Sequence, residues 1–282
     1  MTLSVILSTY RSPEWLEKVL WGYLCQSRRD FELVIADDGS GEGTSRVVRA
    51  CSGAGIPVRH VWQPDEGFRK SRILNRAIGA ARGDYLVFSD GDCIPRGDFV
   101  AVHRANAAKG RFLSGGYVKL PMEVSRAITR AAIESGEAFS VRWIRSRGGR
   151  GRRRMAKLAV PGWAAAAADR ITTTRPSWNG HNASGWRADL IAANGFDERM
   201  GYGGQDRELG ERLENAGIRG LGIRYRALCV HLDHARGYAD LDTIRHNKAI
   251  RRETRARRIT RTPFGMEQSG EPARGTPSPT AP

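Results

Sequence analysis

Tyr85-Leu86-Val87-Phe88-Ser89 runs directly into Asp90-Gly91-Asp92, and this stretch decides the fold. A short hydrophobic run of this kind predicts a strand that is buried on both faces, as in a parallel sheet covered by helices. An Asp-x-Asp sequence by itself is also common in turns. Two carboxylates at the end of a buried strand, however, suit a hard divalent cation that also binds phosphate oxygens.

The residues before this stretch alternate between strand and helix patterns. Apolar side chains at helical spacing follow Pro13, and Gly83 closes a later helical pattern. Because strands separated by helices form parallel sheets, we expect an α/β protein with a mostly parallel sheet flanked by helices. The expected strands are 4–8, 31–36, 58–62 and 85–89, and the expected helices are 13–24, 44–51 and 70–81.

After Pro95 the pattern becomes less regular. Asp206 is expected to cap a helix that ends at Gly217. From about residue 262 the chain is rich in Pro, Gly, Ser and Thr, which predicts a disordered tail. The expected elements are helices at 98–108, 124–139 and 207–216, strands at 111–117 and 222–231, and a mobile Gly/Arg-rich loop at 146–154.

The net charge of +16 is concentrated in two runs of the sequence. Residues 142–157 hold eight Arg and Lys without an acid, and residues 244–262 hold eight with Glu253 as their acid. Together they carry +15, so the rest of the chain is nearly neutral. Each run suits either a solvated face or contact with an anionic membrane. No nucleic acid is expected, because the runs lack the interleaved aromatics of a stacking platform.

The four cysteines stand far apart and form no CxxC pair. Their spacing argues against a zinc site and a disulfide framework and favours a reducing compartment. No stretch approaches the roughly 20 apolar residues of a membrane span. We therefore expect a cytoplasmic protein, and peripheral contact at the inner membrane face is compatible with that expectation.

Polar residues follow three of the expected strands at their carboxyl ends. In an open parallel sheet, ligands bind beyond those ends, so the three clusters are expected to line one pocket. They are Ser8-Thr9-Tyr10-Arg11, Asp37-Asp38-Gly39-Ser40 and Asp90-Gly91-Asp92.

Several motifs occur in a recognisable order along the chain. They are Val5-Ile6-Leu7-Ser8-Thr9-Tyr10, Glu32-Leu33-Val34-Ile35-Ala36-Asp37-Asp38-Gly39-Ser40, Gly67-Phe68-Arg69 with Arg72 and Asn75, and Gly83-Asp84-Tyr85 leading to Asp90-Gly91-Asp92-Cys93-Ile94-Pro95. With these motifs, residues 3–100 resemble glycosyltransferase family two, whose inverting members have the GT-A fold. A later block resembles the C-terminal half of galactosyltransferase-like members; it contains Asn182-Ala183-Ser184-Gly185, Asn194-Gly195-Phe196-Asp197-Glu198 and Gly203-Gly204-Gln205-Asp206-Arg207-Glu208-Leu209.

This resemblance implies a GT-A fold with a Rossmann-like sheet and a C-terminal acceptor-binding half. It implies metal-dependent transfer of a sugar from a nucleotide-sugar to the hydroxyl of a saccharide, glycolipid or small-molecule acceptor. The chain then divides into a nucleotide-sugar-binding half at 1–120, an acceptor-binding and catalytic-base half at 121–262 with a basic loop at 142–157, and a disordered tail at 263–282. Asp38 can accept the hydrogen bond that uracil, but not cytosine, offers at its ring nitrogen, which favours UDP-sugars.

Carried over position by position, the resemblance also assigns roles to individual residues. On the nucleotide side, Ser8 and Tyr10 line the nucleoside pocket, and Asp38 binds the base or the ribose. Arg69 binds the nucleoside or its phosphates, and Asp90 faces the ribose and the metal. The ligands of Mn2+ or Mg2+ are Asp92 and His231, and the general base is Asp206.

Each of these roles has a simpler structural alternative. Tyr10 can be a packing aromatic, Asp38 can satisfy its own turn, and Arg69 can pair with a surface acid. Asp206 can be only a helix cap. His231 can be an ordinary strand-end histidine, with His234 as the metal ligand instead.

Acceptor recognition is expected from residues near the catalytic base. The family usually has Glu-Asp where this chain has Gln205-Asp206, so Gln205 can only hydrogen-bond, and we expect it to contact the acceptor. Trp178 can stack on a sugar or lie in the core, and Asn179 or His181 can bind hydroxyls. The alternative function is a non-catalytic sugar- or nucleotide-binding protein on the same fold, with Gln205 as a trace of a decayed motif.

Overall fold

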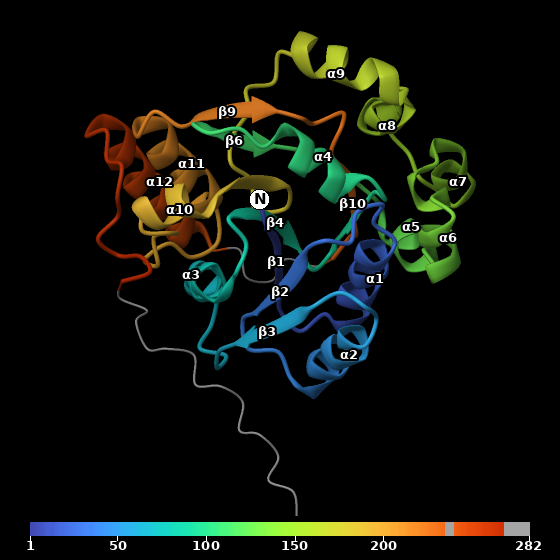
Figure 1. The fold of residues 1–282 in the computed structure, drawn as a ribbon, viewed down its shortest axis with the longest axis horizontal. Coiled ribbons are helices and arrows are strands. Elements are labelled where there is room, and N and C mark those ends of the chain that lie inside the picture. The colour runs from blue at the N-terminus through green and yellow to red at the C-terminus, as the bar shows by residue number, and fades with distance from the viewer. Residues whose placement is uncertain (235–239, 268–282) are drawn as a thin grey trace, which may run out of the picture.

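A seven-stranded sheet forms the centre of the protein in the computed structural model (Figure 1). The structure describes residues 1–234 and 240–267; for residues 152–154 it describes the backbone alone. The strand order is β3-β2-β1-β4-β8-β6-β9. Strands β3, β2, β1 and β4 are parallel, whereas β8 is antiparallel to both of its neighbours. The strands are β1 Leu3–Thr9, β2 Glu32–Asp37, β3 Val58–Trp62, β4 Tyr85–Asp90, β6 Arg111–Ser114, β8 Ala183–Trp186 and β9 Arg219–Gly222. The expected mostly parallel α/β sheet is confirmed.

A smaller sheet lies beside the large one and consists of β5 Cys93–Pro95, β10 Leu228–His231 and β7 Gly116–Lys119, with β10 in the middle. Helices cover both faces of the large sheet (Figure 1). The helices are α1 Pro13–Leu24, α2 Glu42–Ser52, α3 Lys70–Ala80, α4 Phe99–Asn106, α5 Met122–Ala127, α6 Arg130–Glu134, the 3-10 helix η1 Glu137–Phe139, α7 Val141–Ser146, α8 Arg152–Ala159, α9 Gly162–Ile171, α10 Arg187–Ala192, α11 Gln205–Asn215 and α12 Leu241–Ala256.

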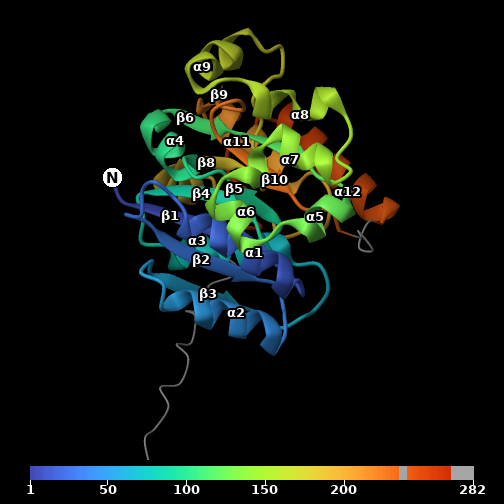
Figure 2. The same ribbon diagram turned by 90° about the vertical axis from the view of Figure 1, so that its right-hand side faces the viewer.

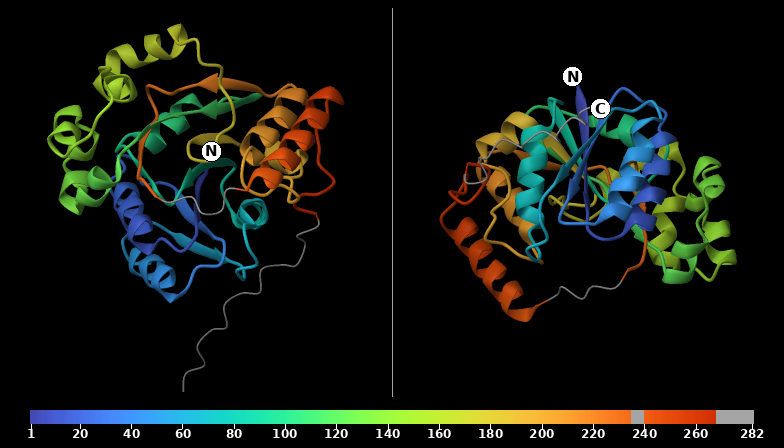
Figure 3. Two further views of the ribbon diagram at one scale, coloured as in Figure 1. Left: turned by 180° about the vertical axis from the view of Figure 1, so that it is seen from behind. Right: turned by 90° about the horizontal axis from the view of Figure 1, so that it is seen from below.

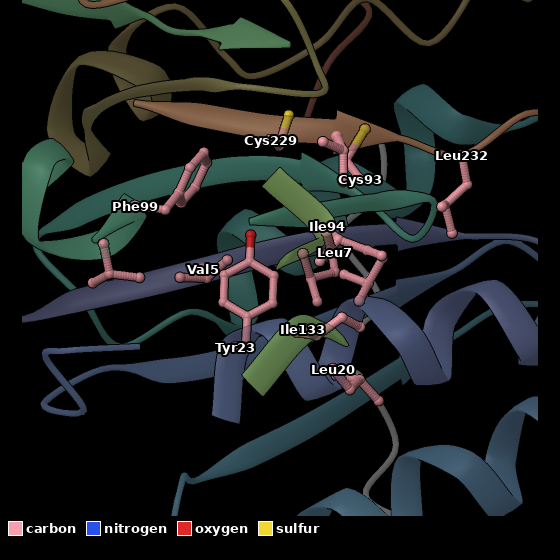
Figure 4. Packing of buried hydrophobic residues seen from close by; sticks show 14 of the residues in the cluster. Val5, Leu7, Leu20, Tyr23, Cys93, Ile94, Phe99, Ile133, Cys229 and Leu232 are labelled. Atoms are coloured by element: carbon pink, nitrogen blue, oxygen red, sulfur yellow. The ribbon is translucent and has the colours of Figure 1, made fainter. Parts of the chain in front are cut away.

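The large sheet separates two hydrophobic cores, which explains why its strands are apolar on both faces. Along β1, Val5 and Leu7 belong to the core that includes α1 and the small sheet, whereas Ile6 belongs to the core that includes α3 and α11. Figure 4 shows Val5 and Leu7 in the first core with Tyr23 of α1 and Ile94 of β5. Side chains alternate between the faces of a strand, so a continuous apolar run fills both cores at once.

Three expected elements are divided in the structure, and these predictions were wrong. The expected strand 111–117 becomes β6 and β7, which belong to different sheets. The chain passes from one sheet to the other at Gly115, where a Cβ would lie 1.9 Å from Asn182 Oδ1. Only glycine, which has no Cβ, fits at this position. The expected strand 222–231 likewise becomes β9 and β10, and the expected helix 124–139 becomes α5, α6 and η1. Thr129 ends that continuity by accepting the Ala132 N–H at 3.2 Å as the cap of α6.

Other expected features near the C-terminal half also need correction. Helix α8 begins at Arg152, so part of the expected loop 146–154 is helical. The cap of α11 is Gly204, at φ 99°, and Asp206 is the second residue of that helix. The expected cap role of Asp206 is therefore wrong. Within the expected tail, residues 263–267 are ordered against the body, where Phe264 O accepts the Glu198 N–H at 2.8 Å, and residues 268–282 lie outside the described residues.

Several helices arise where no helix was expected, among them α9 and α12. Helix α9 comes from an alanine-rich segment, and α12 contains much of the second basic run. Helix α12 packs along α11 (Figure 3), where Thr254 Oγ1 donates to Glu208 Oε1 at 2.9 Å. Arg251 pairs with Glu211 across the same contact at 2.5 Å, so part of the second basic run serves to pack α12 against α11.

The two expected halves of the chain share one sheet. Strand β8, from the second half, lies between β4 and β6 of the first. The halves thus form one packed unit in the structure, and their division into a nucleotide-sugar-binding half and an acceptor-binding half stays a prediction. Among the described residues, no helix is both long and apolar enough to cross a bilayer.

Candidate functional site

A cleft of about 720 Å³ opens at the carboxyl ends of β1, β2 and β4. The starts of α3 and α11 and the end of β10 complete its wall. The expectation that three strand-end clusters line one pocket is confirmed, because the parallel register brings those ends to one edge. Ten of the residues to which the sequence analysis gave a role line the cleft: Ser8, Tyr10, Asp38, Asp90, Asp92, His181, Gln205, Asp206, His231 and His234.

Asp38 lies at the β2 end of the cleft and is held by two donors. Its Oδ1 accepts from Gln63 Nε2 at 2.6 Å, and its Oδ2 accepts the Arg69 backbone N–H at 2.9 Å. Burial raises the pKa of Asp38 above its ordinary value. Tyr10 lies at the rim, is 43% exposed and donates its hydroxyl to Asp65 Oδ2 at 3.0 Å. This end of the cleft thus combines a fixed carboxylate with an exposed aromatic face.

Lys70 is a cleft residue that the sequence analysis missed. Its Nζ lies 2.6 Å from Asp90 Oδ1, and the Ser8 hydroxyl donates to the same oxygen at 2.6 Å. Burial alone would raise the pKa of Asp90, but Lys70 and Ser8 outweigh it and hold that pKa well below its ordinary range. The one available signal in the sequence was position, because Lys70 begins α3 immediately after Gly67-Phe68-Arg69.

Asp92, His231 and His234 form a cluster that can hold a metal ion, with ligand atoms within 4.8 Å of one another. Asp92 Oδ2 lies 2.9 Å from His234 Nε2, and Asp92 Oδ1 lies 3.8 Å from His231 Nε2. His231 Nδ1 donates to the Leu232 carbonyl at 2.7 Å. A carbonyl can only accept, so Nδ1 carries a proton and Nε2 is the ring atom left to bind a metal ion, as in many metal-binding histidines.

The small sheet explains how these three residues meet. Strand β5 begins one residue after Asp92, and its Cys93 pairs with His231 of β10 in antiparallel register. The Leu232 N–H also donates to the Asp92 carbonyl at 2.8 Å. The turn after β4 is therefore joined to the end of β10, and His234 follows three residues further on.

Asp206 lies in the opposite wall, in the first turn of α11. Its Oδ1 is buried and has no hydrogen-bond partner in the described structure. Burial raises the pKa of Asp206, Lys70 opposes this effect, and Asp90 adds to it. The backbone of Gly180 packs directly on the carboxylate, since a Cβ there would lie 2.7 Å from Oδ1. A buried carboxylate with a raised pKa and an unused oxygen is suited to accept a proton.

Gln205 and His181 border this part of the cleft. Gln205 Oε1 accepts the Gly203 N–H at 3.0 Å, which ties the loop before α11 to the helix start. Burial lowers the pKa of His181 to about 4, so its imidazole is neutral at neutral pH. A neutral imidazole can either donate to or accept from a hydroxyl group.

Three residues expected in the site lie outside the cleft. Trp178 is 0% exposed and packs against Phe88 and Phe112, so it is a core residue that cannot stack on a sugar. Asn179 donates to Ser114 Oγ at 3.1 Å instead of facing the cleft. The Arg69 guanidinium pairs with Glu66 at 3.2 Å on the surface, and only its backbone N–H serves the site, through Asp38.

Comparison with known proteins identifies related sequences. A family model described as "Glycosyl transferase family 2" matches residues 4–158. The validoxylamine A glucosyltransferase of Streptomyces hygroscopicus subsp. jinggangensis is 28% identical over 232 residues, which cover 77% of this chain and 52% of that protein. The hyaluronan synthase of Pasteurella multocida is 32% identical over 94 residues, 33% of this chain and 10% of that protein. The chain thus spans about half the length of the first of these relatives.

Solved structures share the fold at low sequence identity. The mannosyltransferase PcManGT from Pyrobaculum calidifontis, in complex with GDP-Man and Mn2+, has a TM-score of 0.55 at 22% identity, covering 90% of this chain and 61% of that one. S. aureus TarS 1-349, in complex with UDP-GlcNAc, has a TM-score of 0.60 at 14% identity, covering 92% and 69%. The expected GT-A fold is confirmed by these neighbours.

Proposed function

The chain belongs to glycosyltransferase family 2, and from this premise we propose that it moves a sugar from a nucleotide-sugar, held through a divalent metal ion, to an acceptor hydroxyl with inversion. One observation carries the proposal. A single cleft joins the Asp92, His231 and His234 cluster to the buried Oδ1 of Asp206, which has no hydrogen-bond partner among the described residues. These are the two groups that the chemistry needs, one for the leaving group and one for the nucleophile.

The leaving-group end of the cleft fits a divalent metal. One carboxylate and two imidazoles, with the Nδ1 proton of His231 held by the Leu232 carbonyl so that Nε2 is the free ligand atom, can hold a divalent ion. Mn2+ is the proposed ion, and Mg2+ is the second choice. An ion bound there would neutralise the charge that develops on the diphosphate. Lys70 places a further positive charge in the same cleft, beside Asp90. We assign Ser8, Tyr10 and Asp38 to the nucleoside and Asp90 to the ribose and metal.

The acceptor end is assigned to Asp206, His181 and Gln205. Asp206 takes the proton from the acceptor hydroxyl as that oxygen attacks the anomeric carbon. Direct displacement from the side opposite the diphosphate inverts the anomeric configuration. His181, neutral at physiological pH, and Gln205 are placed to bind acceptor hydroxyls. A saccharide, a glycolipid or a small molecule with a free hydroxyl fits this description.

A UDP-sugar is the proposed donor, because Asp38 can accept the N3–H of uracil at the nucleoside end. UDP with Mn2+ is expected to raise the melting temperature more than GDP or CDP does at equal concentration. Asp38→Asn should reduce the advantage of UDP over CDP, since an amide can turn its NH2 toward the unprotonated ring nitrogen of cytosine. A larger shift with GDP or CDP would contradict the UDP assignment.

Gly180→Ala tests whether the position of the Asp206 carboxylate matters. The new Cβ would lie 2.7 Å from Asp206 Oδ1 and must displace it. We expect turnover to fall by about tenfold to a hundredfold with UDP affinity unchanged, because a small misplacement of a catalytic group is costly. Gly79→Ala is the matched control, since a Cβ there meets no atom within 4 Å. Equal turnover in both variants would show that the position of the Asp206 carboxylate does not affect catalysis.

The proposal as a whole is tested by incubating the purified chain with a panel of nucleotide-sugars and a series of divalent metals. Metal-dependent release of the nucleoside diphosphate, with or without an acceptor, is the expected result. Metal-dependent binding without release from any donor would favour the alternative, a non-catalytic sugar- or nucleotide-binding protein.

A further inference from the structure

The helices from α7 to α9 form a projecting part of the molecule that we call the basic arm, residues 141–171 (Figure 2). Figure 1 shows α8 and α9 at the margin of the fold, away from the large sheet. Residues 138–168 contain no acid, while 142–157 contain eight Arg and Lys. Among the described side chains, Arg142, Arg145, Arg147 and Arg150 are exposed. Asp169 is thus the one acid within the arm, which presents concentrated positive charge.

Helix α9 has its apolar side toward solvent. Trp163 is 87% exposed and Ile171 is 79% exposed. With the exposed Ala167 between them, they stand four residues apart and so share one face of the helix. A surface helix of a soluble protein normally turns that stripe toward the core. Only Ala165 of this helix is buried, so the apolar face of α9 is offered to something outside the described fold.

The protein body holds α9 in this orientation. Asp169 Oδ1 accepts the Tyr225 N–H at 2.8 Å, and Asp169 Oδ2 accepts from Arg226 Nε at 2.6 Å. The Asp169 side chain is almost fully buried by these contacts. The outward direction of Trp163 is therefore fixed by a buried ion pair on the other side of the helix.

We propose that the basic arm docks on the surface of an anionic lipid bilayer. Trp163 and Ile171 enter the boundary between head groups and acyl chains, where an indole ring is favoured, and the arginines face lipid phosphates. The charge complementarity and the exposed apolar face point to the same partner. A nucleic acid would use the arginines, but its phosphate backbone offers nothing to Ile171 or to the alanine face.

The arm is attached beside the cleft. Lys157 Nζ donates to the Tyr117 carbonyl at 3.0 Å and lies 5.4 Å from the centre of the Tyr117 ring. That ring contacts His181 at 4.3 Å and His231 at 6.0 Å between centroids. Docking would thus hold the cleft wall near the membrane. The docking proposal goes beyond the proposed function and does not depend on it.

The test is sedimentation of the full chain with vesicles of phosphatidylcholine that contain about a third phosphatidylglycerol, a share that makes the surface anionic. Binding is expected at low salt, with loss at high salt and none to pure phosphatidylcholine. Trp163→Ser should weaken binding by about tenfold or more, because the variant has no indole ring to bury in the bilayer. Trp163→Phe should keep binding but lose part of the tryptophan quenching by lipids with brominated acyl chains.

The arginines are tested by replacing Arg142, Arg145 and Arg150 together by alanine. Each arginine near an anionic surface is worth about fivefold in affinity, so a loss of about a hundredfold is expected. The matched controls lie on α12 and in the turn directly after it, where Leu241 is 71% exposed and Lys248, Arg252 and Arg258 are exposed cations. Leu241→Ser and the triple alanine variant of those cations should bind as the unchanged chain does.

Several outcomes would overturn the proposal. Absence of sedimentation at low salt would exclude the bilayer as partner. Losses in the α12 variants as large as those in the arm variants would show that net charge, and not the arm, drives binding. Weakened binding of duplex DNA by the arm variants, with vesicle binding unchanged, would assign the arm to nucleic acid. Unchanged melting temperatures in all variants are required, because they show that the arm remains folded.

Discussion

Asp206→Asn is expected to reduce sugar transfer by about a hundredfold or more while the fold and UDP binding remain. Asparagine has nearly the same shape as aspartate but cannot take a proton from the acceptor hydroxyl. The helix start should survive, because Gly204 and not Asp206 caps α11. The Asp206 Oδ1 atom has no hydrogen-bond partner among the described residues, so the substitution breaks no hydrogen bond at that oxygen. Turnover, UDP affinity and melting temperature should be measured on the same preparation.

Asp189→Asn is the matched control for this variant. Burial also raises the pKa of Asp189, which lies in α10 outside the cleft. Turnover of the control should equal that of the unchanged chain. If Asp206→Asn also turns over normally, Asp206 is not the base. If all three measured properties collapse, the start of α11 has failed, and Gly180→Ala then becomes the deciding variant.

Asp92→Ala is expected to abolish transfer and to remove the effect of Mn2+ on UDP affinity. Asp92 is the one carboxylate shared by both histidines of the cluster, so its loss leaves two imidazoles without an anionic ligand. Changes to groups that only support a metal ligand already cost about tenfold to a hundredfold in metal affinity, and loss of a ligand should cost at least about a hundredfold. Isothermal titration of UDP with and without Mn2+ measures the effect directly.

Asp233→Ala is the control for the metal site. Asp233 is near the same histidines in sequence but pairs with Lys119 at 3.0 Å outside the cleft. Its variant should keep the Mn2+ dependence. His231→Ala and His234→Ala separately show whether one or both imidazoles bind the ion. If the unchanged chain binds UDP equally well with and without Mn2+, the proposed metal role is refuted.

The local part of the fold could be predicted from the sequence. Helix α1 and strand β3 begin and end where expected, because Pro13 starts a helix and the apolar patterns have clear limits. Prediction failed where an element changes sheets, as at Gly115, or where a short contact divides a long pattern, as at Thr129. Those breaks depend on contacts with other segments of the chain, and the hydrophobic periodicity of the sequence does not show them.

Within the candidate site, the sequence identified the residues with strand-end positions and missed those placed by long-range packing. Asp38, Asp90 and Asp92 follow buried strands, so their common edge could be inferred. Lys70 could not be recognised, because a lysine at a helix start is usually solvated, and only packing places it on Asp90. Trp178 is an error of the opposite kind, a core residue that was assigned to the site. Its polar neighbours in the sequence suggested a sugar-binding role, but in the structure Phe88 and Phe112 pack against it in the core.

The sequence by itself determined the parallel sheet, its strand-end carboxylates and the family resemblance, because these rest on local periodicity and short motifs. Only the tertiary structure decided which groups meet. It joined Asp92 to His231 and His234 through the pairing of β5 with β10, and it placed Gly180 against Asp206. These contacts link residues far apart in the chain, and their geometry is set by how two sheets and their helices pack. No pattern of neighbouring residues encodes that packing.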